Sequence, residues 1–162
     1  ATGAATNTPT PAPSTSDAQA ALYCGYAGNV LYFAGVITDD VVTAGTTYQT
    51  TGRISSGDAV RIGLDGRSDG LTIPVREDDH DLYIAPNGRV LDFDTHPIST
   101  TLRVLTISGG WQFELALNAS TLELPTLASG VKWGLIWGLL DADDANGLQH
   151  ILSGTQRRAT IP

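Results

Sequence analysis

The sequence has very little positive charge, almost no sulfur and no long apolar run. It contains one lysine, one cysteine and no methionine in 162 residues, and its formal net charge is −8. A surface with so few cations repels the phosphates of nucleic acids and anionic lipids, so we expect no nucleic-acid partner. No stretch approaches the roughly 18 apolar residues of a membrane helix, so we expect no membrane insertion.

The single cysteine excludes an internal disulfide. Cys24 lies between apolar residues in ALYCGYAG, where we expect a buried thiol rather than a reactive or intermolecular one. The chain starts at ATGAAT without a methionine, which indicates a mature chain after processing or a trimmed chain. We expect an extracellular or cell-surface protein.

The first 17 residues differ in composition from the rest. Residues 1–16 contain only Ala, Thr, Gly, Asn, Pro and Ser, which is typical of an extended linker with polyproline character. The alternating threonines also favour pairing as a strand, and the prolines limit that pairing to a sheet edge. The candidate assembly residues are Thr6, Thr8 and Thr10. We therefore divide the chain into an extended tail, residues 1–17, and a folded domain, residues 18–162.

The folded domain consists of short apolar runs separated by turn residues. Val60, Ile62 and Leu64 face one way and the residues between them face the other, a period of two that predicts a half-buried strand. Asn87-Gly88 predicts a hairpin turn between DLYIA and RVLDF, and SGG predicts another between TLRVLTI and WQFELAL. Many short strands at this spacing predict an all-β fold, an antiparallel β-sandwich with two sheets of jelly-roll or immunoglobulin-like type.

One short helical piece is expected in NASTLEL. Asn118 and Ser120 are the two candidates for its N-cap.

Aspartates gather at the predicted strand ends. Fourteen of the seventeen acids are aspartate, a residue that suits turns, caps and hard-cation sites. The stretch EDDHDLYIAPNGRV alone holds four acids around one histidine. Carboxylates this close repel one another without a cation, so we predict at least one calcium site; the alternative is a set of solvated Asx-turns. The candidate metal ligands are Asp39, Asp40, Asp65, Asp69, Asp78, Asp79, Asp81, Asp141 and Asp143.

No catalytic pattern is visible, and we expect no enzyme. The histidines His80, His96 and His150 lack the close spacing of zinc ligands. There is no G-x-S-x-G nucleophile motif. Among so many aspartates, no one pair can be singled out for glycoside hydrolysis.

Aromatic rings are the residues best suited to stacking on sugars. Trp133 and Trp137 share one sheet face, and Trp111 alternates with apolar residues, so core packing is the alternative for each. Tyr48 lies in a polar loop rich in Thr, Gly and Ser. The candidate ligand contacts are Tyr48, Trp111 and Trp137.

The order of these motifs resembles that of the family 9 carbohydrate-binding modules. NVLYFAGVITDD, GDAVRIGLDG and DDHDLYIAPNG resemble the family's strand ending in T-D-D, its G-D-x-V-x-I-x-x-D element and its acid-rich turn. GWQFELALNASTLEL and WGLIWGLLDADDANGLQHILSG resemble its later strands and D-A-D-D turn. The resemblance covers residues 18–156 and implies an antiparallel β-sandwich of about ten strands, related to the DOMON-like sandwiches.

The resemblance also implies extracellular placement, calcium held in the sandwich and often glycan binding. The family's recurring acids are matched by position by Asp39, Asp40, Asp58, Asp65 and Asp141. Asp58 is expected to tie a loop to a strand end by accepting backbone N–H bonds. Two features depart from the family: the sugar-sandwiching Trp pair has no clear counterpart, and the Thr/Pro tail replaces the usual opening D-G-x-L-D-E-x-W.

Two functions from different classes remain open. The first is a secreted, non-catalytic, calcium-stabilised module that binds a glycan or a cell-surface polysaccharide. The second is a structural subunit of an extracellular filament, whose tail is donated as an edge strand to an identical neighbouring subunit and so builds a homopolymer. Pairing of the tail with another chain would discriminate the second from the first.

Overall fold

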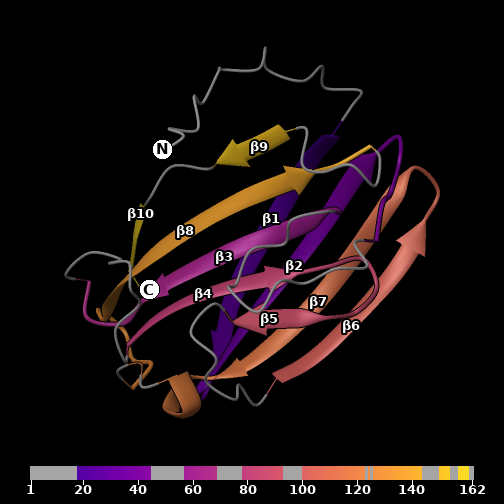
Figure 1. Ribbon diagram of the computed structural model, residues 1–162. Coiled ribbons are helices and arrows are strands. Elements are labelled where there is room, and N and C mark those ends of the chain that lie inside the picture. Colours follow the sequence, from indigo (N-terminus) through magenta and orange to yellow (C-terminus); the bar gives the residue numbers. More distant parts are fainter. Residues whose placement is uncertain are drawn as a thin grey trace, which may run out of the picture.

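The computed structural model describes residues 18–44, 57–68, 78–92, 100–122, 124, 126–143, 150–153 and 157–160. These residues form two antiparallel sheets that face each other across one core (Figure 1). The expected antiparallel β-sandwich is therefore confirmed.

The first sheet has four strands. In spatial order they are β1 (Ala18–Ala27), β2 (Val30–Asp39), β7 (Gly110–Asn118) and β6 (Thr100–Ile107). Every neighbouring pair is antiparallel. Within the described residues, β1 and β6 are its two edges.

The second sheet has six strands. Its main path runs through β10 (Arg157–Thr160), β8 (Lys132–Asp141), β3 (Ala59–Asp65), β4 (Asp79–Ile84) and β5 (Val90–Asp92). The sixth strand, β9 (His150–Ser153), also pairs with β8. β10 pairs with the first half of β8 and β9 with its second half, so the two lie along the same edge of β8.

The predicted turns have the backbone conformations that their residues favour. Gly88 closes the β4–β5 turn with a φ of 81° and donates its N–H to Ala85 O at 3.0 Å. Gly109, with a φ of 74°, turns the chain from β6 into β7. Glycine adopts such positive φ values without steric cost, which is why these dipeptides predict hairpins.

The short helical piece is a 3-10 helix, η1 (Ala119–Leu122). Its cap is Asn118, whose Oδ1 accepts the N–H of Ser120 at 3.0 Å. The N-cap prediction is thus confirmed for Asn118 and not for Ser120. Among the described residues, no helix is long and apolar enough to cross a membrane.

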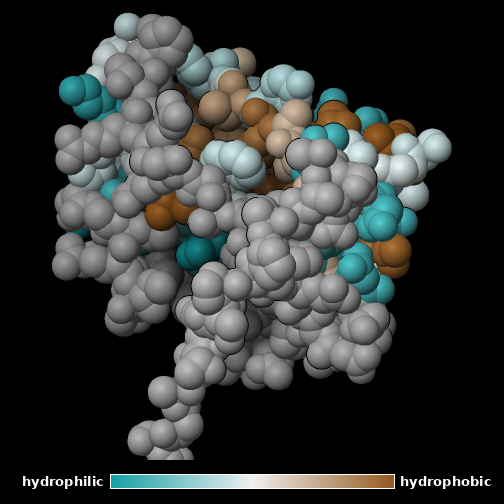
Figure 2. All heavy atoms as spheres, turned by 90° about the horizontal axis from the view of Figure 1, so that it is seen from above, coloured by the Kyte–Doolittle hydropathy of each residue, from teal (hydrophilic) through white to brown (hydrophobic). Residues whose placement is uncertain are grey.

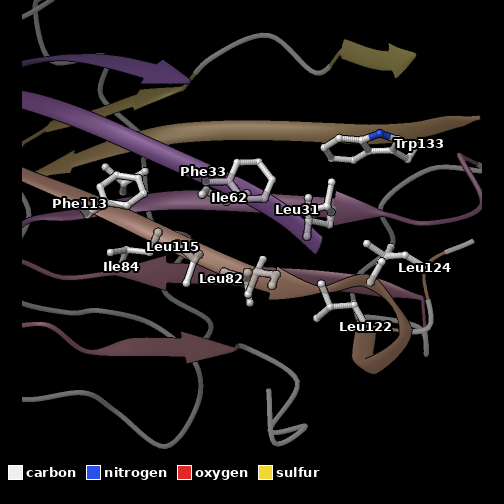
Figure 3. Packing of buried hydrophobic residues seen from close by; sticks show 14 of the residues in the cluster. Leu31, Phe33, Ile62, Leu82, Ile84, Phe113, Leu115, Leu122, Leu124 and Trp133 are labelled. Carbon is white, nitrogen blue, oxygen red and sulfur yellow. The ribbon is translucent and has the colours of Figure 1, made fainter. Parts of the chain in front are cut away.

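The core lies between the two sheets (Figure 3). Phe33 and Leu115 enter it from the four-stranded sheet, and Ile62 and Leu82 enter it from the six-stranded sheet. Trp133 of β8 meets Phe33 edge to face, with ring centroids 6.3 Å apart. Successive side chains of a strand point to opposite faces of the sheet, so every second side chain faces the partner sheet. This is the physical basis of the period-two prediction.

The half-buried pattern predicted for β3 is wrong on its outer side. Val60, Ile62 and Leu64 face the core as expected, but the outward-facing residues are buried too, except Arg61, which is half-buried. β4 is buried along its whole length. One reason is that the outer side chains of these strands cover one another. Arg61 lies over the Tyr83 ring, 5.9 Å from its centroid.

The expectation of a buried thiol at Cys24 is also wrong, because Cys24 is exposed. β1 is an edge strand, and its burial decreases along its length so that Tyr23 to Ala27 are all exposed. The apolar neighbours in the sequence therefore do not place this side chain in the core.

Close packing of β2 against its neighbour β7 in the four-stranded sheet requires glycine at position 35. A Cβ there would collide with the Phe113 ring, whereas a Cβ at Gly25 would meet nothing within 4 Å. We predict that Gly35→Ala lowers the free energy of unfolding by about 1–3 kcal/mol, the usual cost of overpacking a core. Gly25→Ala, the matched strand control, should stay within about 0.5 kcal/mol of wild type. Urea denaturation measures both, and equal stability of the two variants would contradict this packing.

Candidate functional site

Three buried aspartates gather where one end of the sandwich closes. Asp39 is the last residue of β2, Asp58 directly precedes β3, and Asp141 ends β8. Their carboxylate oxygens lie within 4.8 Å of one another. Because β2 belongs to one sheet and β3 and β8 to the other, we name this group the inter-sheet acid cluster.

Asp58 fastens two loops to this cluster. Its Oδ2 accepts the N–H of Thr43 at 2.6 Å, and its Oδ1 accepts the N–H of Ala142 at 2.9 Å. Thr43 follows β2 and Ala142 follows β8, so one carboxylate joins segments of both sheets. The expectation that Asp58 ties loops to a strand end is confirmed.

Burial makes the charge of this cluster costly. Asp58 is only 1% exposed, and desolvation is the main reason that its pKa rises from the usual 3.8 to about 8. The nearby negative charge of Asp39 adds to the rise, while the N–H groups of Thr43 and Ala142 oppose it. The pKa of Asp39 is raised too, first by burial. Without a cation, the cluster therefore retains a proton at neutral pH.

A second cluster lies on the outer face of the six-stranded sheet, and we name it the β3–β4 acid cluster. Asp65 ends β3, Asp79 begins β4, and the two are directly paired across the strands. With Asp78 they form a buried group whose carboxylate oxygens lie within 4.8 Å of one another. Like charges in directly paired positions destabilise a sheet, so this group also calls for compensation.

The surroundings of the β3–β4 acid cluster are shaped to hold it. Asp78 Oδ2 accepts the N–H of Arg67 at 3.0 Å, and the Arg67 Nε lies 3.5 Å from the other Asp78 oxygen. A Cβ at Gly134 would come within 2.9 Å of Asp65 Oδ2, and one at Gly66 within 3.2 Å of the Asp78 carbonyl oxygen. Glycine at these two positions makes room for the acids.

Each cluster can hold a metal ion. Three carboxylates in one small space supply the oxygen ligands that hard divalent cations prefer. The clusters lie at opposite ends of β3, about 23 Å apart at 3.3 Å per residue, so they would be separate sites rather than one shared centre.

Three of the remaining candidate metal ligands, Asp40, Asp81 and Asp143, do not belong to either cluster, and the fourth lies outside the described residues. Asp81 forms a bidentate ion pair with Arg61, at 2.6 and 2.9 Å, instead of joining Asp78 and Asp79. Asp40 is exposed. Asp143 is half-buried and close enough to Asp39 for its charge to contribute to the raised pKa of that residue. Asp69 lies outside the described residues.

His80 has a structural position. Its buried ring places Nε2 2.9 Å from the carbonyl oxygen of Leu122. Since a carbonyl oxygen only accepts, the Nε2–H is the donor, and the ring connects β4 to η1.

The outer face of the four-stranded sheet carries an open groove with aromatic side chains. Tyr23 of β1 and Tyr32 of β2 are 61% and 47% exposed. They border a hollow of about 420 Å³ that is also lined by Arg103 of β6 and Glu114 of β7. A second hollow, of about 650 Å³, continues from Arg103 and Glu114 towards Leu105. We name the two together the outer groove; both volumes are typical of ligand sites.

The outer groove mixes apolar rings with polar groups. Its middle row crosses the sheet through directly paired residues, namely Tyr23, Ala34, Glu114 and Arg103. Hydrophobic and hydrophilic residues also lie side by side over the described part of the surface seen from above in Figure 2. Mixed surfaces of this kind suit ligands that have both apolar faces and hydroxyl groups.

The two tryptophan candidates from the sequence, Trp111 and Trp137, are not among the residues that line the outer groove. Trp111 is 0% exposed and packs beside Phe113 in the core, so its side chain is not a ligand contact. Trp137 is half-buried on β8. Tyr48 and the tail residues lie outside the described part of the chain; the latter are Thr6, Thr8 and Thr10.

Comparison with known proteins shows that the fold of this chain is similar to that of solved carbohydrate-binding proteins. A family 9 carbohydrate-binding module from Caldicellulosiruptor kristjanssonii in complex with cellotriose matches with a TM-score of 0.71 and 18% identity, over 86% of this chain and 67% of that chain. The chain has the β-sandwich fold of family 9 carbohydrate-binding modules. The same organism's module in complex with glucose matches equally well, with a TM-score of 0.71 and 19% identity, over 86% and 68% of the two chains.

A more distant match supports the same fold. A protein from Bacteroides uniformis, described as a putative carbohydrate-binding protein, matches with a TM-score of 0.61 and 12% identity. The match covers 84% of this chain and 68% of that chain. No family model and no curated protein matches the sequence. The expected resemblance to the family 9 sandwich is confirmed at the level of the fold.

The raised pKa of Asp58 predicts a specific pH dependence in the presence of a chelator. Between about pH 4 and pH 8 the folded Asp58 keeps a proton that the unfolded chain has released. The contribution of Asp58 to the free energy of unfolding is therefore largest below pH 4. It decreases as the pH rises to about 8, by on the order of 1 kcal/mol per pH unit.

Denaturant unfolding at several pH values, in chelator, measures this slope. Asp58→Asn should flatten it, because the amide does not titrate. Glu114→Gln, on the outer face of the other sheet, should leave it unchanged. An unchanged slope in Asp58→Asn would show that another group holds the proton.

Proposed function

We propose that the protein is a non-catalytic, extracellular carbohydrate-binding module whose sandwich is stabilised by calcium. The observation that carries the proposal is the outer groove, in which exposed tyrosines stand beside an arginine and a glutamate. The fold supports it, because solved structures with this sandwich include complexes with cellotriose and with glucose.

The chemistry of the outer groove suits sugars. The C–H face of a sugar ring is apolar and flat enough to pack on the rings of Tyr23 and Tyr32. Its hydroxyl groups both donate and accept, so they can accept from the Arg103 guanidinium and donate to the Glu114 carboxylate. Bonds to charged partners are stronger than those between neutral groups.

Calcium fits the two acid clusters. Each offers three buried carboxylates, and calcium takes six to eight oxygens, so backbone carbonyls and water would complete the shell. Asp39, Asp58 and Asp141 would hold one ion between the sheets. When bound, the ion supplies the positive charge that lets all three acids ionise without a proton.

A non-catalytic role is supported by where the acids lie. The acids of both clusters are buried, and several of their oxygens accept backbone N–H bonds that hold loops. Among the described residues that line the outer groove, Glu114 is the one carboxylate. Hydrolysis of a glycosidic bond by the common mechanisms needs two acids that flank the bond.

A second candidate function is head-to-tail assembly through the tail, residues 1–17. What favours it is the edge strand β6, which has eight residues and ends the four-stranded sheet in the described part of the chain. An edge strand presents unpaired N–H and C=O groups that a donated strand can use. In this alternative, identical subunits are the partners and the product is an extracellular filament.

Glycan binding is tested by calorimetric titration with soluble neutral oligosaccharides, cellotriose first. We expect Tyr23→Ala to weaken binding at least tenfold, a loss of about 1.4 kcal/mol. Tyr26→Ala is the matched control, because Tyr26 is an exposed tyrosine of the same strand that does not line the outer groove. Equal losses in the two variants would remove the outer groove from the function.

Assembly is tested by electron microscopy and sedimentation of the full chain beside a form that begins at residue 18. Filaments from the full chain alone would support strand donation and make glycan binding secondary. Monodisperse particles from both forms would contradict the assembly function.

A further inference from the structure

The outer groove crosses the whole four-stranded sheet from edge to edge. Tyr23 lies on the edge strand β1, and Thr101 lies on the opposite edge strand β6. Both residues are exposed. Within the described residues, the groove is therefore open at both ends. A blind pocket, by contrast, would enclose the end of a polysaccharide chain.

The dimensions of the groove fit several sugar units. Four neighbouring strands are about 14 Å across at a spacing of 4.7–4.9 Å, roughly the length of three sugars in an extended chain. The floor is low because it contains Ala34 and Ala116 between the larger side chains. The second hollow extends the surface along the strands towards Val36 and Leu105, which add apolar contact area.

The charges of the groove select against an ionic ligand. Arg103 and Glu114 are directly paired across β6 and β7 and line both hollows, so the charge at its centre is balanced. A polyanion would meet Glu114 and a chain of formal net charge −8. A polycation would meet Arg103. A ligand with hydroxyl groups and no charge can use both side chains at once.

We propose that the outer groove binds an internal stretch of a neutral, linear polysaccharide rather than the end of a chain. This inference rests on the proposed carbohydrate-binding function and adds the class of ligand and its manner of binding. Tyr23 and Tyr32 stack on sugar faces at one side of the sheet. Arg103 and Glu114 bind hydroxyl groups of the sugar that lies over the centre.

The test compares oligosaccharides of increasing length. Cello-, xylo- and manno-oligosaccharides of two to six units are titrated into the full chain, before and after borohydride reduction of the reducing end. For the series that binds, the affinity should rise at least tenfold from two units to four and then level off. Reduction of the six-unit sugar should change its affinity less than twofold, because the groove does not hold the chain terminus.

The position of the ligand is tested with a thiol introduced on the groove face, as Thr101→Cys in a Cys24→Ser background, because Thr101 is exposed and lines the groove. A saturating six-unit sugar should slow alkylation of this thiol by maleimide at least fivefold. Arg103→Gln and Glu114→Gln should each weaken binding about tenfold. Lys132→Gln, which removes an exposed cation on β8, is the matched charge control and should have no effect.

The outcomes distinguish a failure of the internal-stretch inference from a failure of the proposed carbohydrate-binding function. Equal affinity for two and six units, or loss of binding after reduction, would overturn the internal-stretch inference while the carbohydrate-binding function stands. Binding that leaves the alkylation rate of the introduced thiol at position 101 unchanged would overturn the assignment to the outer groove. Failure of all three series to bind would overturn the proposed function and this inference together.

Discussion

Buried negative charge is the constraint on which the rest of the structure depends. The two acid clusters lie at opposite ends of β3, a central strand of the six-stranded sheet, and each brings three carboxylates into a buried space. The inter-sheet acid cluster also holds the loops after β2 and β8 through Asp58. Burying such charge is unfavourable unless a proton or a cation compensates it. We therefore expect the closure of the sandwich at that end to depend on pH and on the concentration of divalent cations.

The two acid clusters and the outer groove lie on different surfaces of the protein. The inter-sheet acid cluster lies at one end between the sheets and the β3–β4 acid cluster on the outer face of the six-stranded sheet. The outer groove uses only the outer face of the four-stranded sheet. The two sheets share one core. Under the proposed function, a bound cation would therefore stabilise the groove without touching the ligand.

Alternation along the strands made much of the fold predictable, and the site less so. Leu31 and Phe33 enter the core as their spacing indicates, and the same alternation puts Tyr32 outside, a signal that the sequence interpretation did not use. Spacing along the chain does not show which acids meet in space. Asp58 belongs to a cluster and was missing from the predicted ligands, whereas Asp81 was predicted and pairs with Arg61. The exposure of Cys24 depends on β1 being an edge strand, which only the assembled sheet shows.

Whether a cation compensates the buried acids is tested most simply by thermal unfolding at neutral pH, in calcium and in chelator. The proteins to compare are the wild type, Asp141→Asn and Asp40→Asn. If a cation compensates the buried acids, calcium should raise the melting temperature of the wild type by roughly 5–10 °C at a hundredfold excess over its dissociation constant. The rise should shrink in Asp141→Asn, whose acid is in a cluster, and persist in Asp40→Asn, whose acid is exposed. A melting temperature that is the same in calcium and in chelator would contradict the account.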